Sequence, residues 1–236
     1  MTQQPEPVIA VHDLVVSFSR WGHSVVALNG LSTTINAGQW VLVTGHNGAG
    51  KSTLLKVITG QIKPDSGEAK VRGHHVGDLS SRELSTEVFM VYQDPLLGTA
   101  PLLTVFENLF VADRNTIRQS KAQLINRYTK LIGPIGLVER MQQPARLLSG
   151  GERQLLAMVI ARLRQAHSVL LDEPISALDP SMVDMCVEQI SEMHRQGKTI
   201  MHATHDTARF RTLADRLITM RAGQIVADEV LTRRTA

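Results

Sequence analysis

GHNGAGKST, at residues 45–53, decides the fold, because it has the spacing of a loop that wraps phosphate groups. Its glycines, Gly45, Gly48 and Gly50, let the backbone turn tightly and bring bare N–H groups against phosphate oxygens. Lys51 adds a positive charge for the β- and γ-phosphates, and the Ser52 hydroxyl is an oxygen ligand of the kind that Mg²⁺ takes. The remaining residues that we expect around the phosphates are His46, Asn47, Ala49 and Thr53.

The segments on both sides of this loop follow in the order that phosphate binding requires. Trp40–Thr44 is an apolar run typical of a buried strand, and Ser52–Ile58 can begin a helix whose N-terminal dipole favours anions. Further along, apolar runs at Val169–Leu171 and Thr199–Ala203 predict strands that alternate with helices. This alternation predicts an α/β domain with a mostly parallel sheet.

Two regions are expected to differ from this core. Val8–Phe18 and Val25–Ile35 read as strands of an antiparallel sheet beside the loop. From about Leu102 the sequence favours helices, expected at residues 104–113, 118–132 and 137–141. The whole chain, 1–236, is therefore predicted to be one domain, with a core at 1–95 and 149–236 and a helical subdomain inserted at about 96–148. A helix is also expected at 206–214.

Composition excludes several classes of protein. The formal net charge of this 236-residue chain is +3, and no block of Lys and Arg indicates a nucleic-acid partner. The single cysteine, Cys186, cannot form an internal disulfide and lies in a helical pattern that favours packing over reactivity. No apolar run approaches the roughly 18 residues of a membrane span, and Met1–Pro7 lacks a signal pattern. The sequence thus predicts a cytosolic chain that could dock on a membrane protein.

A second candidate site follows the apolar run at residues 168–171, where Asp172 and Glu173 stand together. In P-loop proteins an Asp at such a strand end holds Mg²⁺, and a second carboxylate can orient and polarise the attacking water. The alternative is that Asp172, Glu173 and Pro174 only begin a loop. The apolar run before them favours the metal and water roles.

A third motif, LSGGERQ at Leu148–Gln154, precedes a helix that Ser149 can cap and whose N-terminus can face an anion. With it the chain resembles the ATP-binding-cassette ATPases, the nucleotide-binding subunits of ABC transporters. The resemblance covers nearly the whole chain, and the remaining family motifs occur in the family order: Gln93, then SALD at 176–179, then ATHD at 203–206. It implies a P-loop NTPase core with an antiparallel β-subdomain and an inserted α-helical subdomain, and it implies ATP and Mg²⁺ as cofactors.

The resemblance also implies a homodimer. Two copies would face each other head to tail and sandwich two ATP molecules. Ser149, Gly150 and Gly151 of one copy would contact the γ-phosphate that the partner's Lys51 binds, and Asp179 would lie at the dimer interface.

Catalytic and metal-binding roles follow from the same resemblance. Glu173 would activate water, His205 would hold the γ-phosphate and help to position Glu173, and Lys51 and Gln93 would complete the catalytic set. The expected magnesium ligands are Ser52, Gln93 and Asp172.

Family members usually stack adenine on an aromatic side chain ahead of the phosphate loop, and stacking accepts any aromatic face. Phe18 aligns best, Trp21 is the competitor, and plain packing is the alternative for either.

This sequence departs from the family pattern near the signature. Glu152 stands where Gln is commonest, and Leu155 stands where Arg is frequent. Neither is a catalytic position, so both sites of the homodimer are expected to be active.

A single cassette without a membrane span favours the ATPase subunit of a membrane transporter. We expect it at the cytoplasmic face of the inner membrane, held there by permease subunits, with a substrate-binding protein as a further partner. The run Gln93–Leu109 is similar to ATP-binding subunits of amino-acid importers, which indicates a bacterial importer of a small solute. The alternatives are a soluble cassette ATPase of translation or DNA repair and a regulatory module without turnover. The single cassette argues against the first, and the intact Glu173 and His205 argue against the second.

Overall fold

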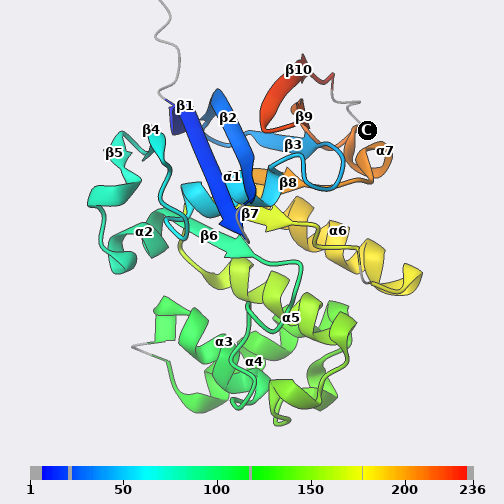
Figure 1. The fold of residues 1–236 in the computed structure, drawn as a ribbon. Helices are drawn as coiled ribbons and strands as arrows, with labels where there is room; N and C mark the ends of the chain where they lie inside the picture. The colour runs from blue at the N-terminus through cyan, green and yellow to red at the C-terminus, as the bar shows by residue number, and fades with distance from the viewer. Residues whose placement is uncertain (1–6, 21–22, 117–118, 177, 233–236) are drawn as a thin grey trace, which may run out of the picture. The chain divides into compact units, whose positions relative to one another are not determined.

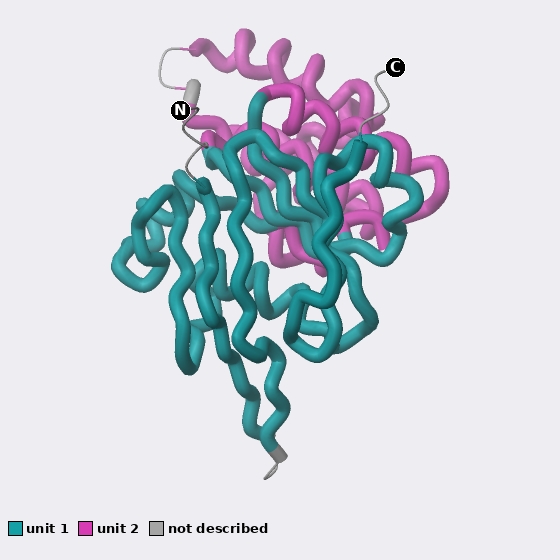
Figure 2. The backbone as a smooth tube through the Cα atoms, turned by 90° about the horizontal axis from the view of Figure 1, so that it is seen from above, with its two compact units in different colours: residues 1–90, 166–173, 197–236 teal, residues 91–165, 174–196 magenta. Residues whose placement is uncertain are grey.

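The computed structural model describes residues 7–20, 23–116, 119–176 and 178–232. Figure 2 shows its two compact units, unit 1 in teal (residues 1–90, 166–173 and 197–236) and unit 2 in magenta (91–165 and 174–196). The strands belong almost entirely to unit 1, and most of the helical residues belong to unit 2. The α/β class expected from the sequence is therefore confirmed.

The six-stranded sheet of unit 1 has the strand order β10-β9-β3-β8-β7-β6. Its central strand β3 is parallel to β8 and β9, β7 is parallel to β8, and β10 runs antiparallel at one edge. The mostly parallel sheet is thus confirmed. The strands are β3 (Trp40–Thr44), β6 (Val88–Val91), β7 (Ser168–Asp172), β8 (Thr199–Ala203), β9 (Arg216–Arg221) and β10 (Gln224–Val230).

Burial explains why these segments form central strands. All residues of β7 and β8 are buried, as in parallel sheets that are covered on both faces. Helix α1 (Lys51–Ile58) begins directly after the phosphate-loop segment, buries Leu54, Leu55 and Ile58, and contacts β7. The loop and the start of α1 therefore lie beside the carboxyl end of β7.

The second sheet of unit 1 is antiparallel and has the order β2-β1-β4-β5. Figure 1 shows its long strands in blue, β1 (Pro7–Arg20) and β2 (His23–Asn36). The shorter strands are β4 (Ser66–Val71) and β5 (His74–His75), and helix α2 (Ser81–Glu87) follows them. The expected antiparallel sheet is confirmed, with both long strands extended beyond their predicted ends.

The helix expected at 206–214 is wrong in length, because α7 covers only Thr207–Phe210. The Asp206 side chain accepts the N–H of Arg209 and caps the helix. The chain then turns, and the amide of Asp215 donates to the carbonyl of Trp40. That bond aligns the next segment as β9, so the helix cannot continue.

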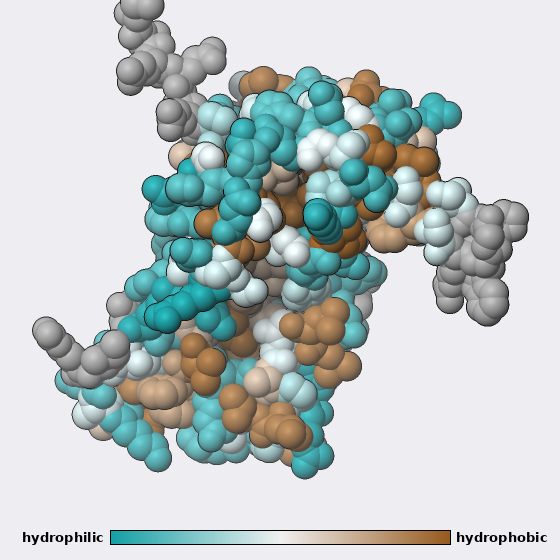
Figure 3. All heavy atoms as spheres, turned by 60° about the vertical axis from the view of Figure 1, so that its left-hand side comes forward, coloured by the Kyte–Doolittle hydropathy of each residue, from teal (hydrophilic) through white to brown (hydrophobic). Residues whose placement is uncertain are grey.

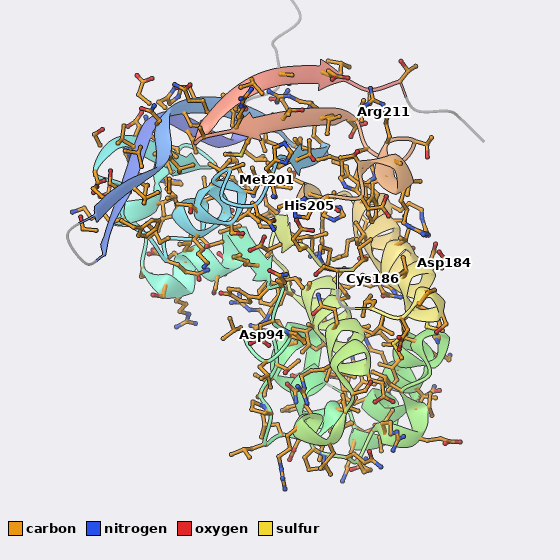
Figure 4. All side chains as sticks on the ribbon, turned by 45° about the vertical axis from the view of Figure 1, so that its right-hand side comes forward. Asp94, Asp184, Cys186, Met201, His205 and Arg211 are labelled. Carbon is orange, nitrogen blue, oxygen red and sulfur yellow. The ribbon has the colours of Figure 1, made fainter. Side chains whose placement is uncertain are left out.

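Unit 2 contains α3 (Val105–Ala112), α4 (Lys121–Ile132), α5 (Gly150–Leu163) and α6 (Pro180–Arg195), and α5 contacts the other three. Short 3₁₀ turns join them at residues 114–116, 133–135, 138–140 and 145–147. The predicted subdomain at about 96–148 lies within unit 2. Cys186 is fully buried on α6 (Figure 4), and burial raises the pKa of its thiol to about 12, so it packs as expected. In the described residues, no helix is both long enough and apolar enough to span a bilayer.

The helix expected at 137–141 is wrong, because only one 3₁₀ turn forms, at Val138–Arg140. The carbonyl of Met141 accepts the N–H of Phe106, and the carbonyl of Gln143 accepts that of Val105. These bonds tie the segment to the start of α3. The amides of Arg140 and Met141 donate to carbonyls three residues earlier, so the segment closes as a 3₁₀ turn and not as an α-helix.

His202, on β8, is an imidazole inside the core of unit 1. The side chain is 0% exposed, and its ring meets Phe210 edge-on with the centroids 4.4 Å apart. Neither ring nitrogen has a hydrogen-bond partner within the described ranges. Burial lowers the pKa of His202 to about 3 from its ordinary 6.5.

Replacing His202 with leucine should flatten the dependence of the unfolding free energy on pH. Above pH 6.5 the imidazole is neutral in both states, so it contributes no pH dependence. Between pH 6.5 and 3 the unfolded chain binds a proton that the folded chain does not, which costs the native state about 1.4 kcal/mol per pH unit. Urea denaturation of both proteins at several pH values measures the two slopes, and identical slopes would contradict the assignment.

Candidate functional site

The phosphate-loop segment joins the end of β3 to the start of α1, and its backbone has room only for glycine at two positions. Gly45 has a φ of 152°, and a Cβ there would lie 2.3 Å from the carbonyl oxygen of Met220. Gly50 has a φ of 102°, and a Cβ there would lie 2.4 Å from the carbonyl oxygen of Ala27. No side chain caps α1 among the described residues, so its first N–H groups are available to an anion.

Lys51 lies within the curve of the loop. Its ammonium donates to the Gly45 carbonyl at 2.7 Å and lies 3.4 Å from the His46 carbonyl oxygen. The side chain is 6% exposed, although it carries a charge, and its Nζ is 3.8 Å from Oε1 of Glu173. A buried cation enclosed by a loop of this geometry suits an anionic ligand such as a phosphate chain.

Ser52 and Asp172 bring two oxygen atoms together. The Ser52 hydroxyl donates to Oδ1 of Asp172 at 2.9 Å, which joins the first turn of α1 to the carboxyl end of β7. Burial raises the pKa of Asp172, while the Ser52 hydrogen bond and the charges of Lys56 and Lys51 oppose that rise. Both oxygen atoms are donors that Mg²⁺ accepts, and this ion is usually bound by one or two protein ligands, waters and substrate phosphates. The pair fits such an ion. The described residues contain no group of three or more His, Cys, Asp or Glu that could hold a metal by itself.

Glu173 has a left-handed backbone conformation, with a φ of 49°, which is uncommon for a residue other than glycine. Such a conformation costs about 1 kcal/mol or more and persists only where the surroundings impose it. Here the N–H of Glu173 donates to the Ala203 carbonyl at 3.0 Å, across to the neighbouring strand β8. The carboxylate therefore leaves the sheet in a fixed direction.

His205 lies beside that carboxylate. Its Nε2 lies 2.9 Å from Oε1 of Glu173. Figure 4 shows His205 in the loop beyond β8, the strand that carries Met201. Burial raises the pKa of Glu173, and the charges of His205 and Lys51 oppose the rise. A carboxylate with a raised pKa and a fixed orientation is suited to accept a proton from water.

The signature forms the start of α5 in unit 2. Ser149 is the N-cap residue, as predicted, and forms a capping box with Glu152: the Ser149 N–H donates to the Glu152 carboxylate at 2.8 Å, and the Glu152 N–H donates to the Ser149 hydroxyl at 3.2 Å. Sequence reasoning missed this role of Glu152, although the spacing Ser-x-x-Glu is its signal. A Cβ on Gly151 would lie 2.4 Å from the sulfur of Met182, so the turn is also tightly packed.

The structure thus brings together one subset of the predicted residues, all in unit 1: Lys51, Ser52, Asp172, Glu173 and His205.

The other predicted residues lie elsewhere in the two units. Phe18, also in unit 1, is 45% exposed near the end of β1 and pairs with Val25 of β2, whereas its competitor Trp21 lies outside the described residues. In unit 2, Gln93 is exposed in the loop after β6, and Asp179 is the exposed N-cap residue of α6. The predicted roles of the residues in both units stay predictions.

The chain is similar to known proteins over most of its length. A protein-family model described as ABC transporter matches residues 28–176. The glutamate/aspartate import ATP-binding protein GltL of Escherichia coli is 34% identical over 212 residues, which cover 89% of this chain and 87% of GltL. The cell division ATP-binding protein FtsE of Bacillus subtilis is 31% identical, with 90% of this chain and 93% of FtsE covered. The solved dimeric structure of the cassette MJ0796 with ADP and Pi has a TM-score of 0.82 and 25% identity, and the match covers 96% of this chain and 100% of that chain.

Proposed function

The chain belongs to the ABC transporter family of ATPases, and from this premise we propose that it powers a bacterial importer of a small solute such as an amino acid. ATP and Mg²⁺ are its cofactors. One observation carries the proposal: Lys51 and the Ser52–Asp172 pair lie beside Glu173 and His205 within one unit. That set provides a phosphate-binding cation, a magnesium position and a held carboxylate.

Each side chain of this set has a separate task in the proposed reaction. Lys51 binds the β- and γ-phosphates and offsets their charge. Ser52 and Asp172 would hold a magnesium ion, which would supply positive charge to neutralise the phosphoryl oxygens. Glu173 orients the attacking water and accepts its proton, and His205 keeps the Glu173 carboxylate in place.

The second half of the site comes, in this proposal, from another copy of the chain. Ser149, Gly150 and Gly151 begin a capped helix whose N-terminal N–H groups favour an anion. The partner's Lys51 would bind the same γ-phosphate from the other side. Gln93 would contact the magnesium ion or the attacking water, and Asp179 would lie at the dimer interface. Support comes from the match to the cassette MJ0796, which was solved as a dimer. Hydrolysis would then depend on closure of two chains, and closure can move an attached protein.

Phe18 is the proposed platform for adenine, because a half-exposed aromatic ring at the end of β1 can stack on a base. Phe18→Ala should weaken ATP binding about tenfold, in line with the 1–3 kcal/mol of base stacking. Trp21→Ala is the matched control and should change the affinity little. A titration with a fluorescent ATP analogue measures both affinities. A larger loss of affinity in Trp21→Ala than in Phe18→Ala would show that adenine stacks on Trp21 instead.

A membrane permease is the proposed partner, at the cytoplasmic face of the membrane. Unit 2 exposes apolar side chains in the loop after β6 and on α3; they include Leu97, Leu102 and Val111, which are 65%, 79% and 60% exposed. Figure 3 shows groups of brown, apolar atoms at the surface in the lower part of the view. Solvated apolar side chains gathered in this way are typical of a surface that a partner covers.

The solute can be tested by uptake. Membrane vesicles that contain the chain with its co-purifying permease should accumulate radiolabelled acidic amino acids when ATP is inside. Vesicles with Lys51→Ala are the matched control. ATP turnover without accumulation of any amino acid would contradict the import proposal but not the ATPase.

The similarity to the cell division ATP-binding protein FtsE supports a second candidate, an ATPase that acts in cell division. Vesicle uptake would be absent, and loss of the chain would change cell separation instead.

A further inference from the structure

Arg153, in the first turns of α5, points its side chain back toward the segment before the signature. Its Nε donates to the Ala145 carbonyl at 3.1 Å. Its Nη2 donates to the carbonyls of Arg146 and Leu148, at 3.1 and 3.0 Å. One guanidinium thus binds three carbonyl oxygens of four consecutive residues.

That segment is held from its other side as well. The N–H of Ala145 donates to the Leu103 carbonyl at 2.8 Å, and the N–H of Arg146 donates to the Pro101 carbonyl at 2.9 Å. The first two amides of the segment are therefore bound by one loop, and three of its four carbonyls are bound by Arg153. The segment ends at Leu148, which is extended and leads directly into the N-cap residue Ser149.

Of the three carbonyls that Arg153 binds, only that of Ala145 also accepts a backbone N–H within the described residues, from Leu148 at 3.2 Å. The segment forms a single 3₁₀ turn, so the carbonyls of Arg146 and Leu148 have no helical N–H to accept. The planar guanidinium presents several donors in a fixed fork, which a lysine cannot reproduce. The contacts lie entirely within unit 2.

We propose that Arg153 is a positioning residue for the signature: its guanidinium fixes residues 145–148, and thereby Ser149 and the following helix N-terminus, in the geometry that binds a partner's γ-phosphate. This inference rests on the proposed nucleotide-sandwich dimer. Arg153 would orient the part of the site that one chain presents to its partner, residues 149–151. It would have no part in ATP binding within its own chain.

The test uses the full-length chain with Glu173→Gln, which is expected to dimerise with ATP. Into it we would introduce Arg153→Gln, Arg153→Lys and, as a matched control on the same helix, Arg162→Gln, because Arg162 instead pairs with Glu192 of α6 at 3.1 Å. ATP affinity is measured on dilute protein with a fluorescent analogue, and dimerisation is measured by light scattering over a concentration series.

Both Arg153 variants should bind ATP within about twofold of the parent, since the groups that bind it within one chain are untouched. Their dimerisation should weaken on the order of 100-fold, the size of effect that misplaced binding groups produce. Arg162→Gln should dimerise like the parent.

Normal dimerisation of Arg153→Lys would overturn the proposal, because charge alone would then suffice. Loss of ATP binding in both Arg153 variants would also overturn it, because the residue would then support the whole fold. If the parent itself stays monomeric with ATP, the sandwich is refuted and the role of Arg153 falls with it, whereas a dimeric parent with equally dimeric Arg153 variants refutes the role of Arg153 alone.

Discussion

Lys51→Ala should abolish measurable ATP hydrolysis, with an expected fall in kcat of about 100-fold or more and an expected loss of ATP affinity of about tenfold. The reason is the position of the ammonium: it is 6% exposed, enclosed by the Gly45 and His46 carbonyls and 3.8 Å from Glu173. No other described cation has this environment within the loop, so nothing would offset the phosphate charge in its place. Phosphate release from the purified chain measures the effect.

Lys70→Ala is the matched control for this variant. Lys70 lies on β4 in the same unit and pairs with Glu68 at 2.8 Å, away from the loop. It should retain wild-type turnover. Undiminished turnover in Lys51→Ala would refute the assignment of the phosphate loop.

Glu173→Gln should lower kcat by about 100-fold or more while ATP binding persists. The amide keeps the shape of the side chain and its contact with His205, but it cannot accept the proton of the attacking water. Burial raises the pKa of the Glu173 carboxyl, which makes the carboxylate a better proton acceptor, and the variant removes this capacity. Glu229→Gln, which alters a surface pair with Arg211, is the control. A Glu173→Gln enzyme with wild-type kcat would show that another group activates the water.

The sequence predicts the centre of this site well because motif spacing and strand order together constrain it. Lys51 and Ser52 follow a buried strand, and Asp172 ends another, so a parallel sheet brings them to the same edge. Their contact through the Ser52–Asp172 hydrogen bond follows from that topology.

Other features depend on contacts between segments far apart in the chain, which periodicity does not reveal. The left-handed backbone of Glu173 is imposed by its bond to Ala203 on another strand. The short α7 reflects the bond between Asp215 and Trp40. The role of Arg153 could not be read from the sequence either, since its partners are backbone carbonyls, which every residue has.

The central claim is that one chain carries only half of a hydrolytic site. Light scattering on Glu173→Gln, with and without ATP and Mg²⁺, tests it most directly. The account predicts a mass equal to one chain, 26.0 kDa, without nucleotide and twice that mass with ATP. A mass that stays at one chain under saturating ATP, in protein that binds the nucleotide, would contradict it.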